Sequence, residues 1–195
     1  MRKGEETRNR VADAAGVLFQ RRGFHGVGMA DVIEASGAPK GSVYFHFRGG
    51  KDELGVAAVE RAAERFGDGI ERVFAAAPTA ADGVDRVCAG MAASLEHTDF
   101  ELGCPIATVA LETAAASPQL AGACAAGFER WLAAIGAGLE RDGHLAGDAG
   151  ELAVLVLSAL EGALILARAS RDTGPIHRVA ARLRPLLERK DPCDS

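Results

Sequence analysis

Aromatic residues are scarce in this chain, whose 195 residues include one Trp, one Tyr and eight Phe. Segments with the β-branched and aromatic alternation of strands are almost absent as well. The part of the chain beyond residue 51 is instead rich in alanine, the residue with the highest helix propensity. These features exclude a sheet-based fold, and the sequence predicts an all-α protein.

Residues that carry chemistry are few and far apart. The four cysteines, Cys88, Cys104, Cys124 and Cys193, form no Cys-x-x-Cys pair and have no nearby histidine partners, which excludes a zinc site and a disulfide framework. The five histidines are scattered, and no Ser/His/Asp spacing stands out. We expect no cofactor, no metal and no enzymatic activity. The first three cysteines are predicted to be core residues, with a redox-sensing thiol as the alternative.

The sequence also lacks a signal peptide, because its N-terminus is charged and then amphipathic. Its most apolar segment, residues 152–167, is interrupted by Ser158, Glu161 and Gly162 and is shorter than the about 20 residues of a membrane span. The sequence therefore predicts a cytoplasmic protein that has no membrane partner.

What the chain does have is enough apolar residues for a core, 48% of the total, and an uneven distribution of charge. The net charge is −5, yet residues 1–51 contain 9 Lys and Arg against 5 Asp and Glu, which gives +4. The remaining residues contain 13 against 22, which gives −9. A basic head on an acidic body is typical of a DNA-binding module joined to a domain with another task.

Residues 30–47 have the pattern of a helix-turn-helix. Short helices are expected over residues 30–36 and 40–47, and Gly37 between them can adopt the positive φ that ends the first one. The second helix, which we call the reading helix, lies in the DNA major groove in such a motif. Val43 and Phe47 are one turn apart and are expected to face the core. The residues left to contact DNA are Lys40, Gly41, Ser42, Tyr44, Phe45 and His46.

The chemistry of these side chains predicts different roles on DNA. The hydroxyl of Tyr44 and the ammonium of Lys51 stand at the edges of the reading helix and are predicted to contact phosphates, although an ordinary boundary tyrosine and a solvated lysine are the alternatives. Lys40 and Ser42 are the expected polar readers of bases. Phe45 could touch a thymine methyl group or simply pack.

Several short motifs between Arg10 and Leu54 are shared with a known family. They are Ala14-Ala15, Leu18-Phe19, Gly23-Phe24, Asp31-Val32, Ala35-Ser36-Gly37, Lys40-Gly41-Ser42-Val43-Tyr44, Phe47 and Lys51-Asp52-Glu53-Leu54. By this combination the chain resembles the DNA-binding domain of the TetR family of bacterial one-component repressors. Residues 47–54 and 103–112 also resemble the LmrA/YxaF branch of that family, so the similarity extends through most of the chain.

Two positions depart from the usual pattern of that family, which places Thr or Ser near Gly28 and Ser near Pro39. A glycine cap at Gly28 and a proline at the first helical position, Pro39, are both compatible with a helix start. We therefore still predict a helix-turn-helix, in which the residues at the two helix starts differ from those usual in the family.

Helical periodicity, together with start and stop signals, predicts about nine helices. We expect residues 1–50 to form the DNA-binding domain and residues 51–195 to form a helical domain for effector binding and dimerisation. The expected helices cover residues 5–22, 30–36, 40–47, 51–77, 81–97, 103–116, 118–141, 148–170 and 176–188.

Large apolar residues from several expected helices are interspersed with alanines and glycines, a composition that leaves room for an apolar pocket. Thr108 and Glu112 share one helix face, and Glu161 interrupts the most apolar helix, where a carboxylate must be paired or face a cavity. Each candidate for ligand contact could instead be plain core or a structural partner. The candidates are Phe66, Ile70, Met91, Leu95, Phe100, Ile106, Ala107, Thr108, Glu112, Phe128, Trp131 and Glu161.

The segment 152–167 is apolar nearly all round, so both of its sides are expected to be buried. The amphipathic helix over residues 176–188 can supply the neighbouring part of the same surface. In the TetR family the last two helices typically form a four-helix dimer interface, and the resemblance implies a homodimer. The predicted interface residues are Leu160, Leu164, Ile176, Val179 and Leu183, although Leu160 or Leu164 could face the internal core instead.

The sequence thus leads to the hypothesis of a homodimeric, ligand-responsive DNA-binding transcriptional regulator. We expect a repressor that a small apolar effector releases from a palindromic double-stranded DNA operator. One alternative is a helical small-molecule-binding protein or enzyme. Another is a regulator that responds to thiol oxidation or to a partner protein.

Overall fold

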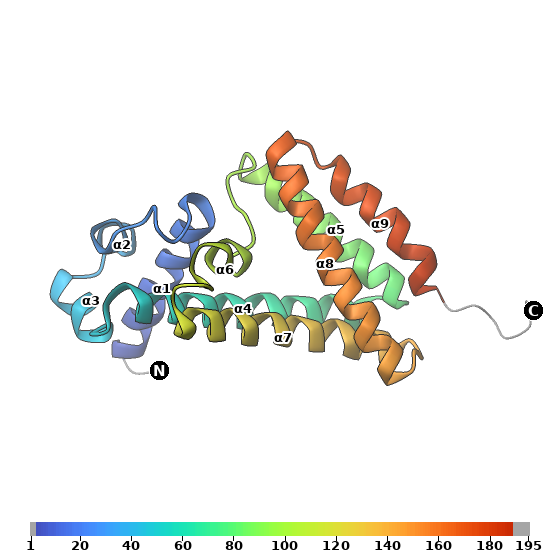
Figure 1. The fold of residues 1–195 in the computed structure, drawn as a ribbon, viewed down its shortest axis with the longest axis horizontal. Coiled ribbons are helices and arrows are strands. Elements are labelled where there is room, and N and C mark those ends of the chain that lie inside the picture. Colours follow the sequence, from blue (N-terminus) through green and yellow to red (C-terminus); the bar gives the residue numbers. More distant parts are fainter. Residues whose placement is uncertain (1–2, 189–195) are drawn as a thin grey trace, which may run out of the picture. The chain divides into compact units, whose positions relative to one another are not determined.

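The computed structural model describes residues 3–188, and this part of the chain contains nine α-helices and no strand (Figure 1). The prediction of an all-α fold with about nine helices is confirmed for these residues. The helices are α1 (Lys3–Arg22), α2 (Met29–Ser36), α3 (Lys40–His46), α4 (Gly50–Ala76), α5 (Ala80–His97), α6 (Ala107–Thr113), α7 (Pro118–Arg141), α8 (Ala146–Ser170) and α9 (Gly174–Leu187).

Most helix boundaries lie within two residues of the prediction, and the start of α3 and the extent of α6 differ in ways that matter. Pro39 is the N-cap of α3 and not its first helical residue, and its carbonyl accepts hydrogen bonds from the amides of Ser42 and Val43. Helix α6 spans Ala107–Thr113, which is shorter than predicted. It begins four residues later than predicted, and beyond Thr113 the chain turns, with the amides of Ala116 and Ser117 both donating to the carbonyl of Thr113.

The described chain folds into two compact units, each built from two separate stretches of sequence. The first unit contains the residues up to Arg65 together with Leu102–Glu129. The second contains Phe66–Glu101 and the residues from Arg130 onward. Helices α4 and α7 contribute residues to both. The predicted functional boundary between residues 50 and 51 stays a prediction.

In the first unit, α1 packs against α2, α3 and α6. Val11, Ala15 and Phe19 are buried along one face of α1, as expected for residues at helical spacing. Val43 of α3 and Phe47 after it are completely buried, which confirms that they anchor the reading helix. The exposed side of α3 is thereby fixed.

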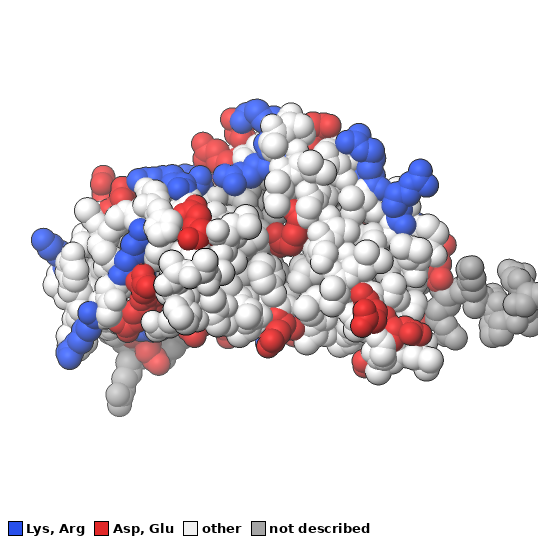
Figure 2. Space-filling model, viewed as in Figure 1, with Lys and Arg blue, Asp and Glu red and all other residues white. Residues whose placement is uncertain are grey.

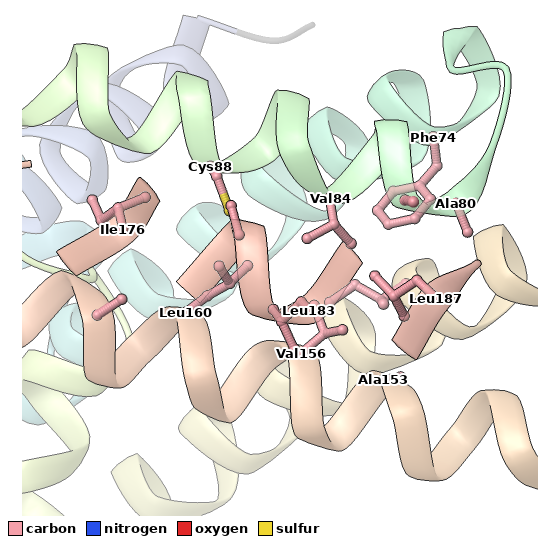
Figure 3. Close-up of a cluster of buried hydrophobic side chains, with 14 of the residues drawn as sticks. Phe74, Ala80, Val84, Cys88, Ala153, Val156, Leu160, Ile176, Leu183 and Leu187 are labelled. Atoms are coloured by element: carbon pink, nitrogen blue, oxygen red, sulfur yellow. The ribbon is translucent and has the colours of Figure 1, made fainter. Parts of the chain in front are cut away.

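In the second unit, α5, α8 and α9 pack side by side (Figure 3). Helix α8 contributes a buried stripe with alternating spacings of four and three residues, the pattern of a coiled-coil seam. The stripe consists of Ala149, Ala153, Val156, Leu160, Ala163 and Ala167. Val84, Cys88 and Leu95 of α5 lie in the same core.

Helix α8 has the length and composition of a membrane span, with a mean hydropathy of 2.0 over its most apolar window. The segment 152–167 led to the opposite expectation because it is shorter than a membrane span, whereas the helix that contains it is 25 residues long. One such helix is weak evidence for a membrane protein. Helix α9, which packs beside it, exposes Arg178 and Arg182, and these charges do not suit a bilayer.

Candidate nucleic-acid interface

The start of α2 is held in place by hydrogen bonds to the carboxylate of Asp31. Gly28 is an extended N-cap, and its amide donates to Oδ2 of Asp31 at 2.6 Å. Both terminal nitrogens of Arg22 donate to Oδ1 of Asp31 at 3.1 Å. The hydrogen bonds from Gly28 and Arg22 lower the pKa of Asp31, so the carboxylate stays charged at neutral pH. The end of α1 is thus tied to the first turn of α2.

The turn between α2 and α3 uses the glycine that the sequence indicated. Gly37 has φ 60° and ψ 15°, and its amide donates to the carbonyl of Glu34. The hydroxyl of Ser36 accepts from the amide of Ala38 at 3.3 Å. Helix α3 then begins at Lys40 with its direction set by this short turn.

Helix α3 brings six of the seven predicted DNA-contact residues together. The side chains of Tyr44 and Phe45 are 46% and 63% exposed, which is unusual for aromatic residues with no role at a surface. Ser42 and His46 are half-buried. Lys40 and Gly41 are exposed at the start of the helix.

Lys51 lies in different surroundings from the other six. It is half-buried, and its Nζ lies 4.4 Å from the centroid of the Phe24 ring, a cation–π contact. Burial lowers the pKa of Lys51, while the charges of Asp52, Glu112 and Asp31 act in the opposite direction. The ammonium therefore helps to hold the first unit together, and its contact with a phosphate stays a prediction.

The sequence reasoning missed Arg48 as a functional candidate. Arg48 is exposed directly after the reading helix, and its guanidinium lies 5.3 Å from the centroid of the Phe45 ring. His46 approaches the same ring edge-on at 5.3 Å. The sequence could have identified Arg48 by its position, because a cationic side chain directly after the reading helix is well placed to contact a phosphate.

The predicted ligand-contact residues are divided between the two units. Five lie in the first unit, namely Ile106, Ala107, Thr108, Glu112 and Phe128. Seven lie in the second unit, namely Phe66, Ile70, Met91, Leu95, Phe100, Trp131 and Glu161.

Four of these candidates are core residues or form hydrogen bonds within the protein. Ile106 and Leu95 are completely or almost completely buried core residues, because neighbouring helices close over them. The hydroxyl of Thr108 donates to the carbonyl of Cys104 at 2.7 Å. The carboxylate of Glu112 accepts from the amide of His25 at 2.8 Å.

Other candidates in the second unit are exposed or only partly buried. Phe66 is partly exposed, and its ring packs on that of the buried Trp131 with centroids 5.8 Å apart. Ile70, Met91 and Phe100 are partly buried against the core of that unit.

Three predicted interface residues, Leu160, Ile176 and Leu183, are buried inside the second unit, whereas the prediction placed them on its surface. They point inward because they fall on the core-facing sides of α8 and α9. Leu164 and Val179 are partly buried against the same core. The exposed large apolar residues of α8 are Val154, Leu155, Ile165 and Leu166.

The three cysteines that the structure describes, Cys88, Cys104 and Cys124, are buried as predicted, and Cys193 lies outside the described residues. Burial raises the pKa of Cys88 to about 12 and that of Cys124 to about 11. No group of three or more potential metal-binding side chains occurs among residues 3–188.

The fold and the exposed reading helix define a helix-turn-helix DNA-binding protein, and comparison with known proteins gives the same class. The family model of bacterial regulatory proteins of the tetR family matches residues 11–58. A second model, the C-terminal domain of LmrA/YxaF-like transcriptional regulators, matches residues 80–182. The chain therefore belongs to the TetR family of DNA-binding transcriptional regulators, and its C-terminal part is of the LmrA/YxaF-like type.

Individual relatives are similar to this chain over almost its whole length. An uncharacterized HTH-type transcriptional regulator of Mycobacterium tuberculosis is 37% identical over 92% of this chain and 93% of its own length. The HTH-type transcriptional regulator LmrA of Bacillus subtilis is 29% identical over 94% of this chain and 98% of its own. A crystal structure of a TetR transcriptional regulator from Chloroflexus aurantiacus matches with a TM-score of 0.78 at 29% identity, covering 96% of both chains.

Regulators of this family bind DNA and act as dimers, and they are transcription factors without enzymatic activity. The predictions of family membership and of a non-enzymatic function are thereby confirmed. The sequence alternative of an enzyme is set aside.

Proposed function

We propose that this regulator is a cytoplasmic homodimer that represses transcription from a two-fold symmetric DNA operator and is released by a small apolar effector. The observation that carries the DNA-binding part is the geometry of α3. Val43 is buried beneath it, while Tyr44 and Phe45 stand out from the surface. We infer that this exposed face enters the major groove and that Arg48 and Tyr44 contact phosphates.

The outer face of α8 supports the homodimer. Val154, Leu155, Ile165 and Leu166 are 50%, 44%, 55% and 61% exposed, and the surface over α8 in Figure 2 is mostly uncharged. An apolar face of this kind on a soluble regulator marks an interface.

The order of residues on this face fits a second copy of the same chain. The large residues come in two pairs, 154–155 and 165–166, which lie at equal distances on either side of position 160. The exposed Ser158 and Gly162 lie between them and permit close approach. In an antiparallel pair of α8 helices, Val154 would therefore face Leu166 of the partner subunit. Such self-complementarity is what a two-fold interface requires.

The effector part of the proposal has support in the second unit. Phe66 and Trp131 form an aromatic pair that is buried at one end and exposed at the other, and Ile70, Met91 and Phe100 are only partly buried. Surfaces of this composition suit an apolar ligand. Leu95 and Ile106 are left out of the proposed contacts, since both are already closed into the core.

Control by thiol oxidation is less well supported than control by a ligand. The thiolate is the reactive form of cysteine, and burial raises the pKa of Cys88 and Cys124 far above neutral pH. Both thiols are therefore poor nucleophiles in this fold.

Selection of DNA from a random pool with the purified protein tests the proposal. The enriched sequences should contain two inverted half-sites whose centres are about one helical turn apart, or a multiple of it. Enrichment of a single asymmetric site would argue against a two-fold dimer on DNA. An apolar compound that changes Trp131 fluorescence should release the selected duplex over the same concentration range.

A further inference from the structure

Glu112, near the end of α6, is joined to the turn that follows α1. Its Oε2 accepts a hydrogen bond from the amide of His25 at 2.8 Å. Its main-chain oxygen lies 3.3 Å from Nε2 of His25, which donates to it when that nitrogen carries the proton. Both residues belong to the first unit, and 87 positions separate them in the sequence.

Gly23 allows this close approach. It has φ 77°, a conformation that favours glycine, and its amide donates to the carbonyl of Phe19. A Cβ atom at position 23 would overlap Oε1 of Glu112. The glycine therefore ends α1 and at the same time leaves room for the carboxylate.

The turn that Glu112 holds determines where α2 begins. Phe24 is buried and packs on Phe19 with ring centroids 5.1 Å apart. Arg22 donates to the carbonyl of Gly26 at 2.9 Å and also binds Asp31 in α2. A shift of this turn would move α2, and with it the α3 helix that follows after three residues.

The segment that contains Glu112 is attached to α1 at a second point. The amide of Gly103 donates to the carbonyl of Gln20 at 3.3 Å, and Nε2 of Gln20 donates back to the carbonyl of Gly103 at 2.9 Å. The Gln20 side chain is buried, which makes this pair of bonds costly to lose. Residues 103–112 are thus fixed on the end of α1, and Glu112 is the charged group that they present to the turn.

We propose that Glu112 is a positioning residue for DNA binding: its carboxylate holds the turn at residues 23–25, and through it α2 and α3, in the geometry that fits DNA. This inference rests on the proposed DNA-binding function of α3. It assigns Glu112 a role in the DNA-binding unit in place of the ligand contact predicted from the sequence.

The proposal can be tested by whether replacing Glu112 strengthens or weakens DNA binding. A negative charge in the unit that carries the basic head opposes DNA binding, so its removal alone should strengthen binding. Loss of the positioning bond should do the reverse. Glu112→Gln removes the charge but keeps an oxygen that can accept from His25, whereas Glu112→Ala removes both. Glu60→Ala, which removes an exposed acid from α4 in the same unit, is the matched control.

The experiment measures binding of the full-length variants to a duplex selected with the parent protein, over a range of salt concentrations. We expect Glu112→Gln and Glu60→Ala to bind as tightly as the parent or more tightly, and Glu112→Ala to bind about tenfold more weakly. The slope of log affinity against log salt should be the same for all four proteins, because no phosphate contact is lost.

Equal affinities of the Ala and Gln variants would overturn the inference while leaving the proposed function intact. If the parent enriched no sequence at all, both would be overturned. Hydrogen exchange at the His25 amide gives a reading that does not depend on the folding of the Ala variant. Slow exchange in the parent and in Glu112→Gln supports the inference, and fast exchange in the parent contradicts it.

Discussion

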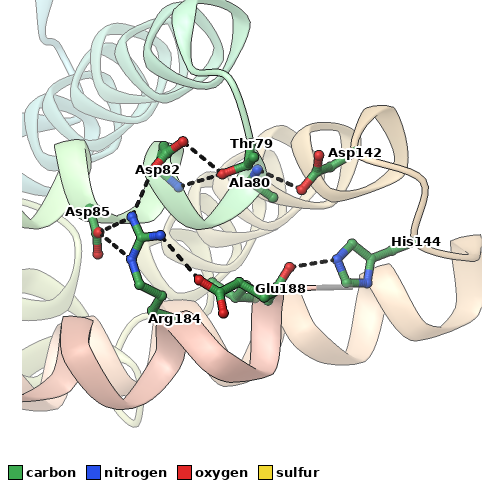
Figure 4. Close-up of polar contacts among 9 residues, drawn as sticks. Thr79, Ala80, Asp82, Asp85, Asp142, His144, Arg184 and Glu188 are labelled. Carbon is green, nitrogen blue, oxygen red and sulfur yellow. Dashed lines mark hydrogen bonds and ion pairs between the residues drawn. The ribbon is translucent and has the colours of Figure 1, made fainter. Parts of the chain in front are cut away.

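Nε and Nη2 of Arg184 on α9 both donate to Oδ2 of Asp85 on α5, at 3.0 and 2.7 Å (Figure 4). The same Nη2 donates to Oδ1 of Asp82 at 2.7 Å. One guanidinium near the end of α9 thus binds two carboxylates in the first turns of α5. Nearby, the amide of Ala80 donates to Asp142 at 2.8 Å, so α5 begins among several fixed polar groups.

Replacement of Arg184 should loosen this end of the second unit. Arg184→Met keeps the apolar stem but leaves Asp82 and Asp85 without their shared cation. We expect the melting temperature to fall by a few degrees, since the side chains are about one third exposed and solvent screens the pairs. Arg178→Met, an exposed arginine on the same helix, is the control and should melt like the parent.

The contribution of Asp82 should depend on pH. Hydrogen bonds from Arg184 and then from Thr79 lower the pKa of Asp82 in the folded state. A lowered pKa stabilises the fold above the ordinary value near 4, and this stabilisation is lost as the pH falls through the folded-state value. The melting temperatures of the parent and of Asp82→Asn should therefore differ at pH 7 and converge below about pH 4. A constant difference across that range would contradict the assignment.

Phe45 on the reading helix and Arg48 just after it should affect DNA binding differently. Arg48→Ala should weaken binding to all sequences alike and reduce the salt slope by about one, because a phosphate contact is lost. Phe45→Ala should change which sequence a random pool yields, since a ring can contact a thymine methyl group. Arg72→Ala, an exposed arginine of the second unit, should leave both properties unchanged.

The exposed face of α8 should be required for dimerisation. Ile165→Glu places a charge on the proposed interface, and light scattering should then report a monomer of about half the parent mass. Leu145→Glu is the control, because Leu145 is also exposed apolar surface but precedes the helix. A dimeric Ile165→Glu protein would rule out this face.

The inward face of α8 should instead affect folding. Leu160→Ala deletes buried methyl groups from the core of the second unit and should cost about 2–5 kcal/mol of unfolding free energy. The protein that remains folded should still be dimeric. Denaturant unfolding combined with light scattering separates the two effects.

The reading helix could be predicted in detail because its signals are local. Gly37 marks the turn, and the spacing of Val43 and Phe47 assigns the buried face, so the exposed residues follow by exclusion. The two faces of α8 could not be distinguished in this way, since both are apolar. Its core stripe consists largely of alanines that pack closely, while large residues such as Ile165 stand on the outside. Periodicity identifies the faces of a helix but not which of two apolar faces turns inward.

The role of Glu112 was beyond sequence reasoning for a different reason. Its partner, His25, is 87 residues away, and no local pattern connects α6 with the turn after α1. Gly23 offered a partial signal, because it indicated a turn, but a helix stop alone explains that glycine. Only the fold shows that the turn is held from outside the helix-turn-helix.

The first unit is built from two separate stretches of sequence, and this affects how hybrids of such regulators can be made. Consider a hybrid in which only residues 1–58 come from a relative. Its α1 and the turn after α1 would then come from one protein, while their contact partners Gly103 and Glu112 would come from the other. The contacts Gln20–Gly103 and His25–Glu112 both cross that junction. An exchange of DNA specificity between relatives should therefore carry residues 102–129 along with the head, so that the two stretches are inherited as a pair.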